Sequence, residues 1–409
     1  MNTSNKLKIF NDPIYGFITI PNPLIFDLIA HPYFQRLRRI SQMGLSYLVY
    51  PGAHHTRFHH ALGCLHLMQK VVRILKFKGI SISNQEENAL YIAILLHDIG
   101  HGPFSHAMEH SIVHEISHES ISLRFMQDLN NEFEGRLSLA ITMFKGDYSR
   151  QFFGQLISSQ LDMDRSDYLK RDSFYTGVSE GNINSERLIS MMNVVDDHLV
   201  IEKKGIYSIE KFLTSRRLMY WQVYLHKTSL VAEQMIINVL KRAKQLAQQS
   251  VALNVSPAFG FFLEETINPT NFDTSVLEQF SKLDDYDIVA ALKSWQNHSD
   301  DVLRDISVRL LERKLLKIKF YKKNQIQSEL DRLQKQWIAQ TDNKATDVAY
   351  FVFSRSIKNT GYTPHDDGIS ILHKDGSISD VIDASDNLNL KGLSKTVKRH
   401  YICFPKELL

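Results

Sequence analysis

His97 to His106 reads His-Asp-Ile-Gly-His-Gly-Pro-Phe-Ser-His, directly after the apolar run Ala89 to Leu96. The run predicts a helix that is buried on most sides, and the two glycines and the proline of the quoted stretch predict that this helix ends abruptly. His97 and Asp98 then lie in its last turn, and His101 lies just beyond it. The sequence therefore predicts a rigid corner that carries three titratable side chains.

The histidines of the chain are concentrated around this corner. Eleven of the eighteen lie between residues 54 and 118, where an even spread would give about three. The dipeptide His-Asp alone means little, because chance supplies about one, and the second copy at His365-Asp366 lies in a run typical of a solvated turn. The copy at His97-Asp98 differs because other ligand-type residues accompany it, with His60 and Asp164 each at the start of a predicted helix.

Composition limits the class of protein. The 409 residues, 43% of them hydrophobic, suffice for one large or two medium domains with an ordinary core. Cys64 and Cys403 form no metal or disulfide spacing, which suits a reducing compartment. The N-terminus lacks a signal pattern, and no apolar run approaches the ~20 residues of a membrane span, so we expect a cytoplasmic protein without a membrane partner. A net charge of +3 does not indicate nucleic acid as a partner.

Apolar residues recur at helical spacing through most of the chain. We expect a mainly α fold with short β-hairpins, one at Lys8 to Ile20 and one around a turn at Lys203-Lys204-Gly205. A composition change near Leu315 predicts a small C-terminal α+β lobe over residues 316–409, after a helical region over residues 1–315. The basic cluster from Arg313 to Lys323 is expected to be a solvated helix face.

Four ligand-type residues come from the ends of three predicted helices, namely His60, His97, Asp98 and Asp164. Zn, Fe, Mn and Ni ions favour imidazole and carboxylate ligands that are held rigidly and face one another. A helical bundle can bring such helix ends together. A metal held this way would keep open positions for water and a phosphate oxygen, and it would polarise a phosphoryl group.

Several sequence blocks, in order, support a specific resemblance. They are Lys-Ile-Phe-Asn-Asp-Pro-Ile at 8–14, Phe-Gln-Arg-Leu-Arg at 34–38, His-Thr-Arg-Phe-His-His at 55–60, the quoted stretch at 97–106, and Asp-Met-Asp-Arg-Ser-Asp-Tyr at 162–168. Together they resemble the HD-domain metal phosphohydrolases, and within them the deoxynucleoside triphosphate (dNTP) triphosphohydrolases. The resemblance covers about Lys8 to Lys227 and implies a helical HD core at about residues 50–180.

The resemblance implies roles for individual residues. The implied metal ligands are His60, His97, Asp98 and Asp164. Among the implied catalytic residues, His101 lies near the α-phosphate and His106 is the acid that protonates the leaving sugar oxygen. Glu109 orients His106, at a position where the family has Asp, and His118 matches a pocket histidine of the family. The implied substrate contacts are Arg57 and Arg216 as phosphate clamps, Arg165 at a basic position of the family, and Gln42, Tyr168, Asp172 and Tyr224 at the sugar. Tyr220 stands where family members use His to contact substrate, and Met43 replaces a leucine under the sugar. Lys8, Gln35 and Arg38 match an effector site, where Ala30 replaces an acidic residue that selects guanine.

The implied activity is hydrolysis of a dNTP at the α-phosphate, which gives a deoxynucleoside and tripolyphosphate. It would use one divalent metal ion of the Mn, Fe, Zn or Ni type, with Mg as a further ion on the substrate phosphates. The resemblance also implies a homo-oligomer and a nucleotide effector. Two alternatives stay open: an HD phosphohydrolase that acts on other nucleotides or phosphomonoesters, and a catalytically idle module that senses nucleotides or binds nucleic acid.

Overall fold

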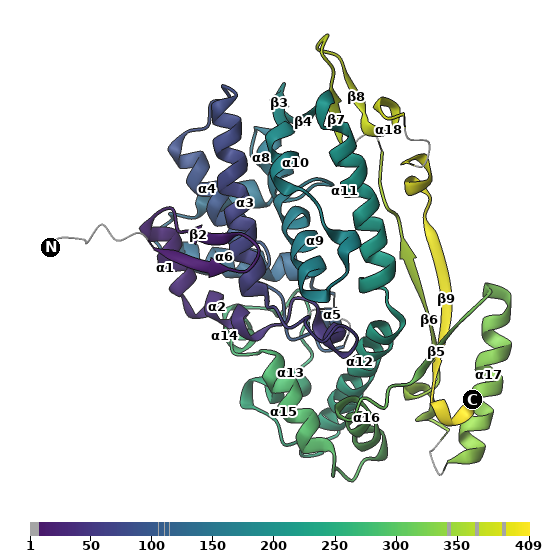
Figure 1. Cartoon of the computed structure of the whole chain (residues 1–409). Helices are drawn as coiled ribbons and strands as arrows, with labels where there is room; N and C mark the ends of the chain where they lie inside the picture. Colours follow the sequence, from purple (N-terminus) through teal and green to yellow (C-terminus); the bar gives the residue numbers. More distant parts are fainter. Residues whose placement is uncertain are drawn as a thin grey trace.

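The computed structural model describes residues 8–104, 106–109, 111–113, 115–341, 345–364, 368–386 and 390–409. The side chains of His106 and Glu109 lie outside this description, as do His365 and Asp366. The described chain is mainly helical, as the hydrophobic periodicity predicts, with a few short strands (Figure 1). Among the described residues, no helix is both long enough and apolar enough to cross a membrane.

The helices fall into a larger first group and a smaller group that follows it. The first ten are α1 (Pro23–Ala30), α2 (Pro32–Gln35), α3 (Arg57–Phe77), α4 (Asn84–Leu96), α5 (His106–Glu109), α6 (His118–Glu132), α7 (Ser138–Phe144), α8 (Gln151–Ile157), α9 (Met163–Thr176) and α10 (Ser185–Met191). The others are α11 (Ile206–Met219), α12 (Lys227–Gln248), α13 (Pro257–Glu264), α14 (Thr274–Phe280), α15 (Asp285–Trp295), α16 (Asp301–Leu311), α17 (Ile326–Gln340) and α18 (Val381–Ala384).

Helix α3 lies at the centre of the first group, where it packs against both α4 and α9 (Figure 1). Its apolar stripe is buried, including Leu65, Met68 and Leu75 at 0% exposure. Every residue from Ala89 to Leu96 on α4 is buried as well, which confirms the predicted burial on most sides. A helix this enclosed holds its last residues in a fixed position, and those residues begin the quoted stretch.

The helical stretch predicted from Ile209 to Gln249 is interrupted. A π-helical turn, η5 (Tyr220–Tyr224), follows α11, and the amide of Leu225 donates to the carbonyl of Tyr220 at 2.8 Å. His226 then caps α12, because its Nδ1 accepts a hydrogen bond from the amide of Thr228 at 3.2 Å. The interruption lets α12 leave the direction of α11 and pack against α13 and α16 at the lower end of the molecule (Figure 1).

Three small sheets flank the helices. The first is the predicted N-terminal hairpin, β1 (Ile9–Asp12) with β2 (Gly16–Thr19). The second has the order β3-β4-β7-β8, formed by Met192–Val195, His198–Glu202, Ser370–Leu372 and Ile378–Asp380, with β4 and β7 parallel. The third has the order β5-β9-β6, formed by Lys317–Tyr321, Val397–Phe404 and Phe353–Asn359.

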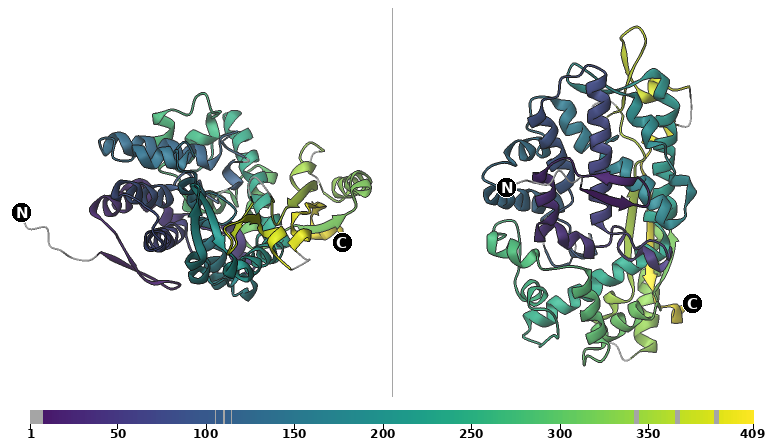
Figure 2. Two further views of the ribbon diagram at one scale, coloured as in Figure 1. Left: turned by 90° about the horizontal axis from the view of Figure 1, so that it is seen from above. Right: turned by 60° about the vertical axis from the view of Figure 1, so that its left-hand side comes forward.

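The C-terminal residues therefore contribute to two sheets. The third sheet and α17 lie along one side of the helical body (Figures 1 and 2). Strands β7 and β8 instead extend the hairpin formed by β3 and β4, since β7 pairs with β4. A division of the chain into domains at residue 315 stays a prediction.

Two local predictions were wrong. The hairpin turn lies at Asp196-Asp197, both with positive φ, while Lys203–Gly205 is a 3-10 turn that leads into α11. Aspartate tolerates the left-handed region that a two-residue hairpin turn requires, so this pair was the turn signal. The basic cluster from Arg313 to Lys323 contains strand β5 and no helix face. Its lysines alternate with residues such as the buried Ile318, which is a period of two.

Candidate active site

A close approach between α4 and α6 fixes the corner after Leu96. The amide of Gly100 donates to Oγ of Ser122 at 2.9 Å, and this hydroxyl donates to the carbonyl of His97 at 2.8 Å. A Cβ at Gly100 would lie 2.2 Å from the carbonyl oxygen of His118 and 2.3 Å from the amide nitrogen of Ser122. Only a glycine lets the first turn of α6 pack against the end of α4, and the corner is rigid for this reason.

The four predicted metal ligands converge at this corner. Nε2 of His60 lies 3.1 Å from Oδ1 of Asp164 and 3.7 Å from Oδ2 of Asp98. Nε2 of His97 lies 3.4 Å from Oδ1 of Asp98 and 3.8 Å from Oδ1 of Asp164. The donors come from the first turn of α3, the end of α4 and the first turn of α9, which are the three helix ends that the sequence indicated.

These donors fit a divalent metal ion of the transition type. Bonds of 2.0–2.2 Å to nitrogen and oxygen place neighbouring ligands about 3.0 to 4.2 Å apart, and the four separations lie in this range. Nε2 of His97 is buried and makes no hydrogen bond to the described residues. Burial works against a charged His97, but Asp98 and Asp164 raise its pKa, so positive charge is favoured between these carboxylates.

Both histidines that are predicted as ligands are oriented by their second ring nitrogen. Nδ1 of His97 lies 2.7 Å from the carbonyl of Ile94, and Nδ1 of His60 lies 2.8 Å from Oδ2 of Asp167. Such contacts fix the tautomer, so that Nε2 is left as the ligand atom. Burial alone would raise the pKa of Asp167, but Arg171 and His60 hold it at about 2.

Asp167 was not selected from the sequence. It lies three residues after Asp164 in the same block, and both are on α9. Its carboxylate accepts from Nε and Nη2 of Arg171 at 2.8 and 3.0 Å, and Nη1 of Arg171 donates to Asp12 at 2.8 Å. The N-terminal hairpin is therefore connected to His60 through a buried chain of charges.

Cys64 is also close to the ligands, one helical turn after His60. Its Sγ lies 3.6 Å from each ring nitrogen of His60. Burial raises the pKa of this thiol well above its usual value. The possible ligand atoms of His60, Cys64, His97 and Asp164 all lie within 4.8 Å of one another, so the thiol borders the predicted metal site.

Arg57, His101 and His118 lie beside the ligands. Arg57 is buried and donates from Nη1 to Oδ2 of Asp98. His101 approaches the other oxygen of Asp98 at 3.5 Å, and its ring stacks on that of His118 with centroids 3.8 Å apart. Burial and the charge of Arg57 lower the pKa of His101 well below its usual value, so its imidazole is neutral at neutral pH.

A cavity of about 630 Å³ opens from this cluster. Asp164, Arg57 and Arg165 line it, and most of the other lining residues come from α5, the first turn of α6, α9, α12 and the turns η2 (Gly44–Leu48) and η5. Most of the predicted substrate residues line it: Gln42, Met43, Arg57, Arg165, Tyr168, Asp172, Tyr220 and Tyr224, together with His118.

Asp172 is fixed at the wall of this cavity. Its Oδ1 lies 2.8 Å from Nε2 of His55, and its Oδ2 accepts from the hydroxyl of Tyr224 at 2.7 Å. His55 in turn stacks on Tyr175, with ring centroids 4.4 Å apart. His55, which was not among the predicted site residues, therefore positions one of the predicted sugar contacts. The edge of Tyr168 meets Tyr224 on the same wall.

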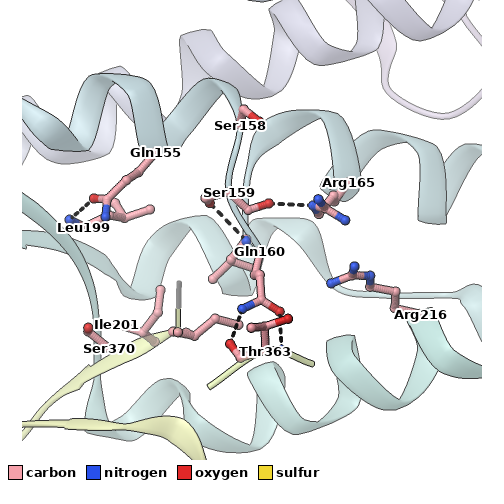
Figure 3. A pocket seen from close by; sticks show the side chains of 13 residues that line it. Gln155, Ser158, Ser159, Gln160, Arg165, Leu199, Ile201, Arg216, Thr363 and Ser370 are labelled. Atoms are coloured by element: carbon pink, nitrogen blue, oxygen red, sulfur yellow. Dashed lines mark hydrogen bonds between the residues drawn. The ribbon is translucent and has the colours of Figure 1, made fainter. Parts of the chain in front are cut away.

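Figure 3 shows a second cavity, of about 430 Å³, which Arg165 lines. Arg165 also lines the first cavity. Arg216 lines this second cavity, and its Nη1 is buried with no hydrogen bond to the described residues. Nε of Arg165 donates to the carbonyl of Ser159 at 2.5 Å, which holds its guanidinium at the junction. Polar and apolar side chains line the remainder, among them Gln160, which exchanges two hydrogen bonds with the backbone of Thr363.

Some predicted site residues are placed less completely. Helix α5 contains His106 and Glu109, and Ala107 between them lines the first cavity, but their side chains lie outside the described part of the chain. In the predicted effector group, Gln35 donates to the carbonyl of Ile29 at 2.7 Å and accepts from Arg38 at 2.8 Å. Lys8 lies over the ring of Phe26, 4.7 Å from its centroid.

Comparison with solved structures supports the fold over the whole chain. The chain is similar to a phosphohydrolase from Bacteroides thetaiotaomicron, with 52% identity, a TM-score of 0.93, and coverage of 98% of this chain and 100% of that one. It is also similar to a protein from Aquifex aeolicus, with 26% identity, a TM-score of 0.75 and 98% coverage of both chains.

Sequence comparison gives the family. Residues 57–171 match the model of the HD domain, and residues 183–254 match that of the HD associated region. The protein YwfO of Bacillus subtilis is 32% identical over 98% of this chain and 93% of its own length. The deoxynucleoside triphosphate triphosphohydrolase SAMHD1 homolog of Dictyostelium discoideum is 32% identical over 59% of this chain and 51% of its own. The HD match includes all four predicted ligand residues and Asp167, and the chain belongs to the HD-domain phosphohydrolases.

Proposed function

We propose that this phosphohydrolase cleaves deoxynucleoside triphosphates at the α-phosphate and releases a deoxynucleoside and tripolyphosphate. The observation that carries the proposal is the pair of cavities that meet at Arg165. The first is large enough for a nucleoside and is lined by Asp164 of the predicted metal-ligand cluster, while the second is lined by Arg165 and Arg216. A triphosphate passing from one cavity into the other would have its α-phosphate beside the cluster.

The side chains around the cluster have distinct proposed tasks. His60, His97, Asp98 and Asp164 would hold one divalent ion, which supplies Lewis acidity and lowers the pKa of water when bound. Arg57 and Arg165 would neutralise phosphate oxygens near the cluster, and Arg216 would do so further along. The neutral imidazole of His101 would contact the α-phosphate, and His106 would protonate the departing sugar oxygen, with Glu109 orienting it.

The sugar would lie against the wall formed by α9 and η5. Both oxygens of Asp172 are oriented by His55 and Tyr224, so the carboxylate can accept a hydrogen bond from a sugar hydroxyl without moving. The ring of Tyr168 borders the same space. Oxygen Oε1 of Gln42 is buried and accepts no hydrogen bond from the described residues, and it is a second acceptor for the sugar.

Several wider proposals accompany this activity. The metal is of the Mn, Fe, Zn or Ni type, with Mg on the substrate phosphates. A nucleotide effector would bind near Lys8, Gln35 and Arg38, and the protein would act in the cytoplasm as a homo-oligomer. Comparing dNTPs supplied singly with a mixture of all four tests the effector, because activation appears only in the mixture.

The test of the activity is incubation of the metal-loaded protein with each dNTP, followed by separation of the products. We expect deoxynucleoside and tripolyphosphate in equal amounts, and no turnover by an Asp164→Asn variant. Cleavage of other phosphate esters without release of tripolyphosphate from any dNTP would reject the substrate and keep the hydrolase. Loss of activity in Tyr168→Ala and Asp172→Ala variants would support the position of the sugar.

A further inference from the structure

A short segment at the start of α15 contacts the stretch of chain that follows α4. Arg36 is fully buried and donates to the carbonyl of Ile99 at 2.7 Å and to the carbonyl of Leu283 at 3.1 Å. Two residues after Leu283, Oδ1 of Asp285 accepts a hydrogen bond from the amide of Phe104 at 2.8 Å. The stretch that bears the predicted ligands and catalytic residues is therefore held at two points by one segment from a distant part of the sequence.

The second oxygen of Asp285 holds another segment of the site. Its Oδ2 accepts from the amide of Ser41 at 2.8 Å. Gln42 follows directly in the chain, and the carbonyl of Ile40 accepts from the amide of Arg57 at 3.0 Å. Both Gln42 and Arg57 line the first cavity. One carboxylate, 6% exposed, therefore joins the segment around Ser41 to the segment before α5.

Phe104 has a backbone conformation that needs support from its surroundings. Its φ of 48° lies in the left-handed region, which bulky side chains rarely adopt. Its amide donates to Asp285, and its carbonyl accepts from the amide of Ala107 on α5 at 3.2 Å. Strained residues of this kind persist only where other contacts hold them, and they cluster at functional sites. The position of α5, the helix that contains His106, therefore depends on the hydrogen bond between Phe104 and Asp285.

We infer that Asp285 is a positioning residue, which holds the segment before α5 and the segment around Ser41 in the relative position that the active site requires. This inference rests on the proposed function, because it assigns the effect to His106 on α5 and to the sugar contact Gln42. Asp285 is not among the described residues that line the first cavity, so it acts through the two amides. A carboxylate offers two acceptor oxygens, whereas an asparagine offers one oxygen and an NH₂ group that opposes the second amide.

The experiment compares the wild type with Asp285→Asn and, as a matched control, Asp284→Asn. Asp284 is equally buried, accepts from the amide of Tyr286 at 3.0 Å and pairs with Arg39. Misplacing a catalytic group by about 1 Å costs about 100-fold in rate, so kcat for dNTPs should fall about 10- to 100-fold in Asp285→Asn, with a smaller change in KM and unchanged metal affinity. Asparagine caps a helix as well as aspartate does, so Asp284→Asn should stay within about twofold of the wild type.

Amide hydrogen exchange, resolved to single residues by mass spectrometry, tests the two contacts without substrate. Loss of a hydrogen bond to a charged acceptor changes an opening equilibrium by about tenfold or more, so the amides of Ser41 and Phe104 should exchange at least that much faster in Asp285→Asn, and at the wild-type rate in Asp284→Asn. In the wild type both amides should exchange slowly although neither lies in a helix. Fast exchange of both in the wild type would overturn the inference even if a variant fails to fold.

The two assays separate this inference from the proposed function. Hydrolysis of dNTPs by the wild type with an unchanged kcat in Asp285→Asn would overturn the inference and leave the proposed function intact. An equal fall of kcat and of melting temperature in both variants would show a merely structural role and would also overturn it. Faster exchange confined to Asp285→Asn, with no hydrolysis of any dNTP by the wild type, would reject the proposed function and keep Asp285 as the residue that positions α5.

Discussion

Replacing Asp167 by asparagine should weaken metal binding without displacing any metal ligand. The substitution keeps the size of the side chain and removes the negative charge that lies 2.8 Å from Nδ1 of His60. Loss of such an orienting partner lowers metal affinity about 10- to 100-fold, which corresponds to about 1.4 to 2.7 kcal/mol. The charge of Arg171 also loses a buried partner, so we expect the free energy of unfolding to fall by up to about 3 kcal/mol.

Asp12→Asn is the matched control for this experiment. Asp12 contacts the same Arg171 at 2.8 Å but has no contact with His60, and its Oδ1 accepts turn amides that an asparagine oxygen can still accept. Both variants should lose similar stability in urea denaturation, while only Asp167→Asn should bind metal weakly in calorimetric titration of the metal-free protein. Equal metal affinities for the two variants would refute the reasoning that Asp167 acts through His60.

Three further predictions concern other parts of the fold. In a denaturant titration, Gly100→Ala should lower the free energy of unfolding by about 3 kcal/mol, because its Cβ would lie 2.2 Å from a backbone atom. As a control, Gly260→Ala on α13 should leave the free energy of unfolding unchanged or raise it. Arg216→Ala should raise KM for dNTPs about tenfold with unchanged metal affinity, and an unchanged KM would contradict its position along the triphosphate. Burial, helped by Lys70, lowers the pKa of His66 to about 4. The unfolded chain then binds a proton that the folded chain does not bind, so stability falls as the pH drops from about 6.5 toward 4. A His66→Gln variant should show a smaller fall in melting temperature over that range.

The corner at His97 could be predicted because its causes are local. An apolar run, two glycines and a proline determine where α4 ends, and these are neighbours in the sequence. The clustering of His60 and Asp164 beside it required the resemblance, since spacing alone does not show which helix ends meet. Asp167 follows at a helical spacing from Asp164, but nothing in the sequence indicates that it faces His60.

The parts that were missed depend on long-range packing or on weak local signals. The second cavity is formed where Gln160 bonds the backbone of Thr363, and no local pattern joins residues so far apart in the chain. The role of His55 depends in the same way on its contact with Asp172. The Asp196-Asp197 turn and strand β5 depend on local sequence, but their charged residues make the local signal weak. Two aspartates adopt the left-handed conformation of the turn, and lysines occupy exposed positions of the strand.

The central claim is that water attacks the α-phosphorus of a dNTP at the cluster of His60, His97, Asp98 and Asp164. The most direct test is hydrolysis of dGTP in oxygen-18 water, with the products separated and their mass measured. We expect one labelled oxygen in tripolyphosphate and none in deoxyguanosine, and no reaction after the metal is removed. Label in deoxyguanosine, or release of a nucleoside monophosphate with pyrophosphate, would contradict it.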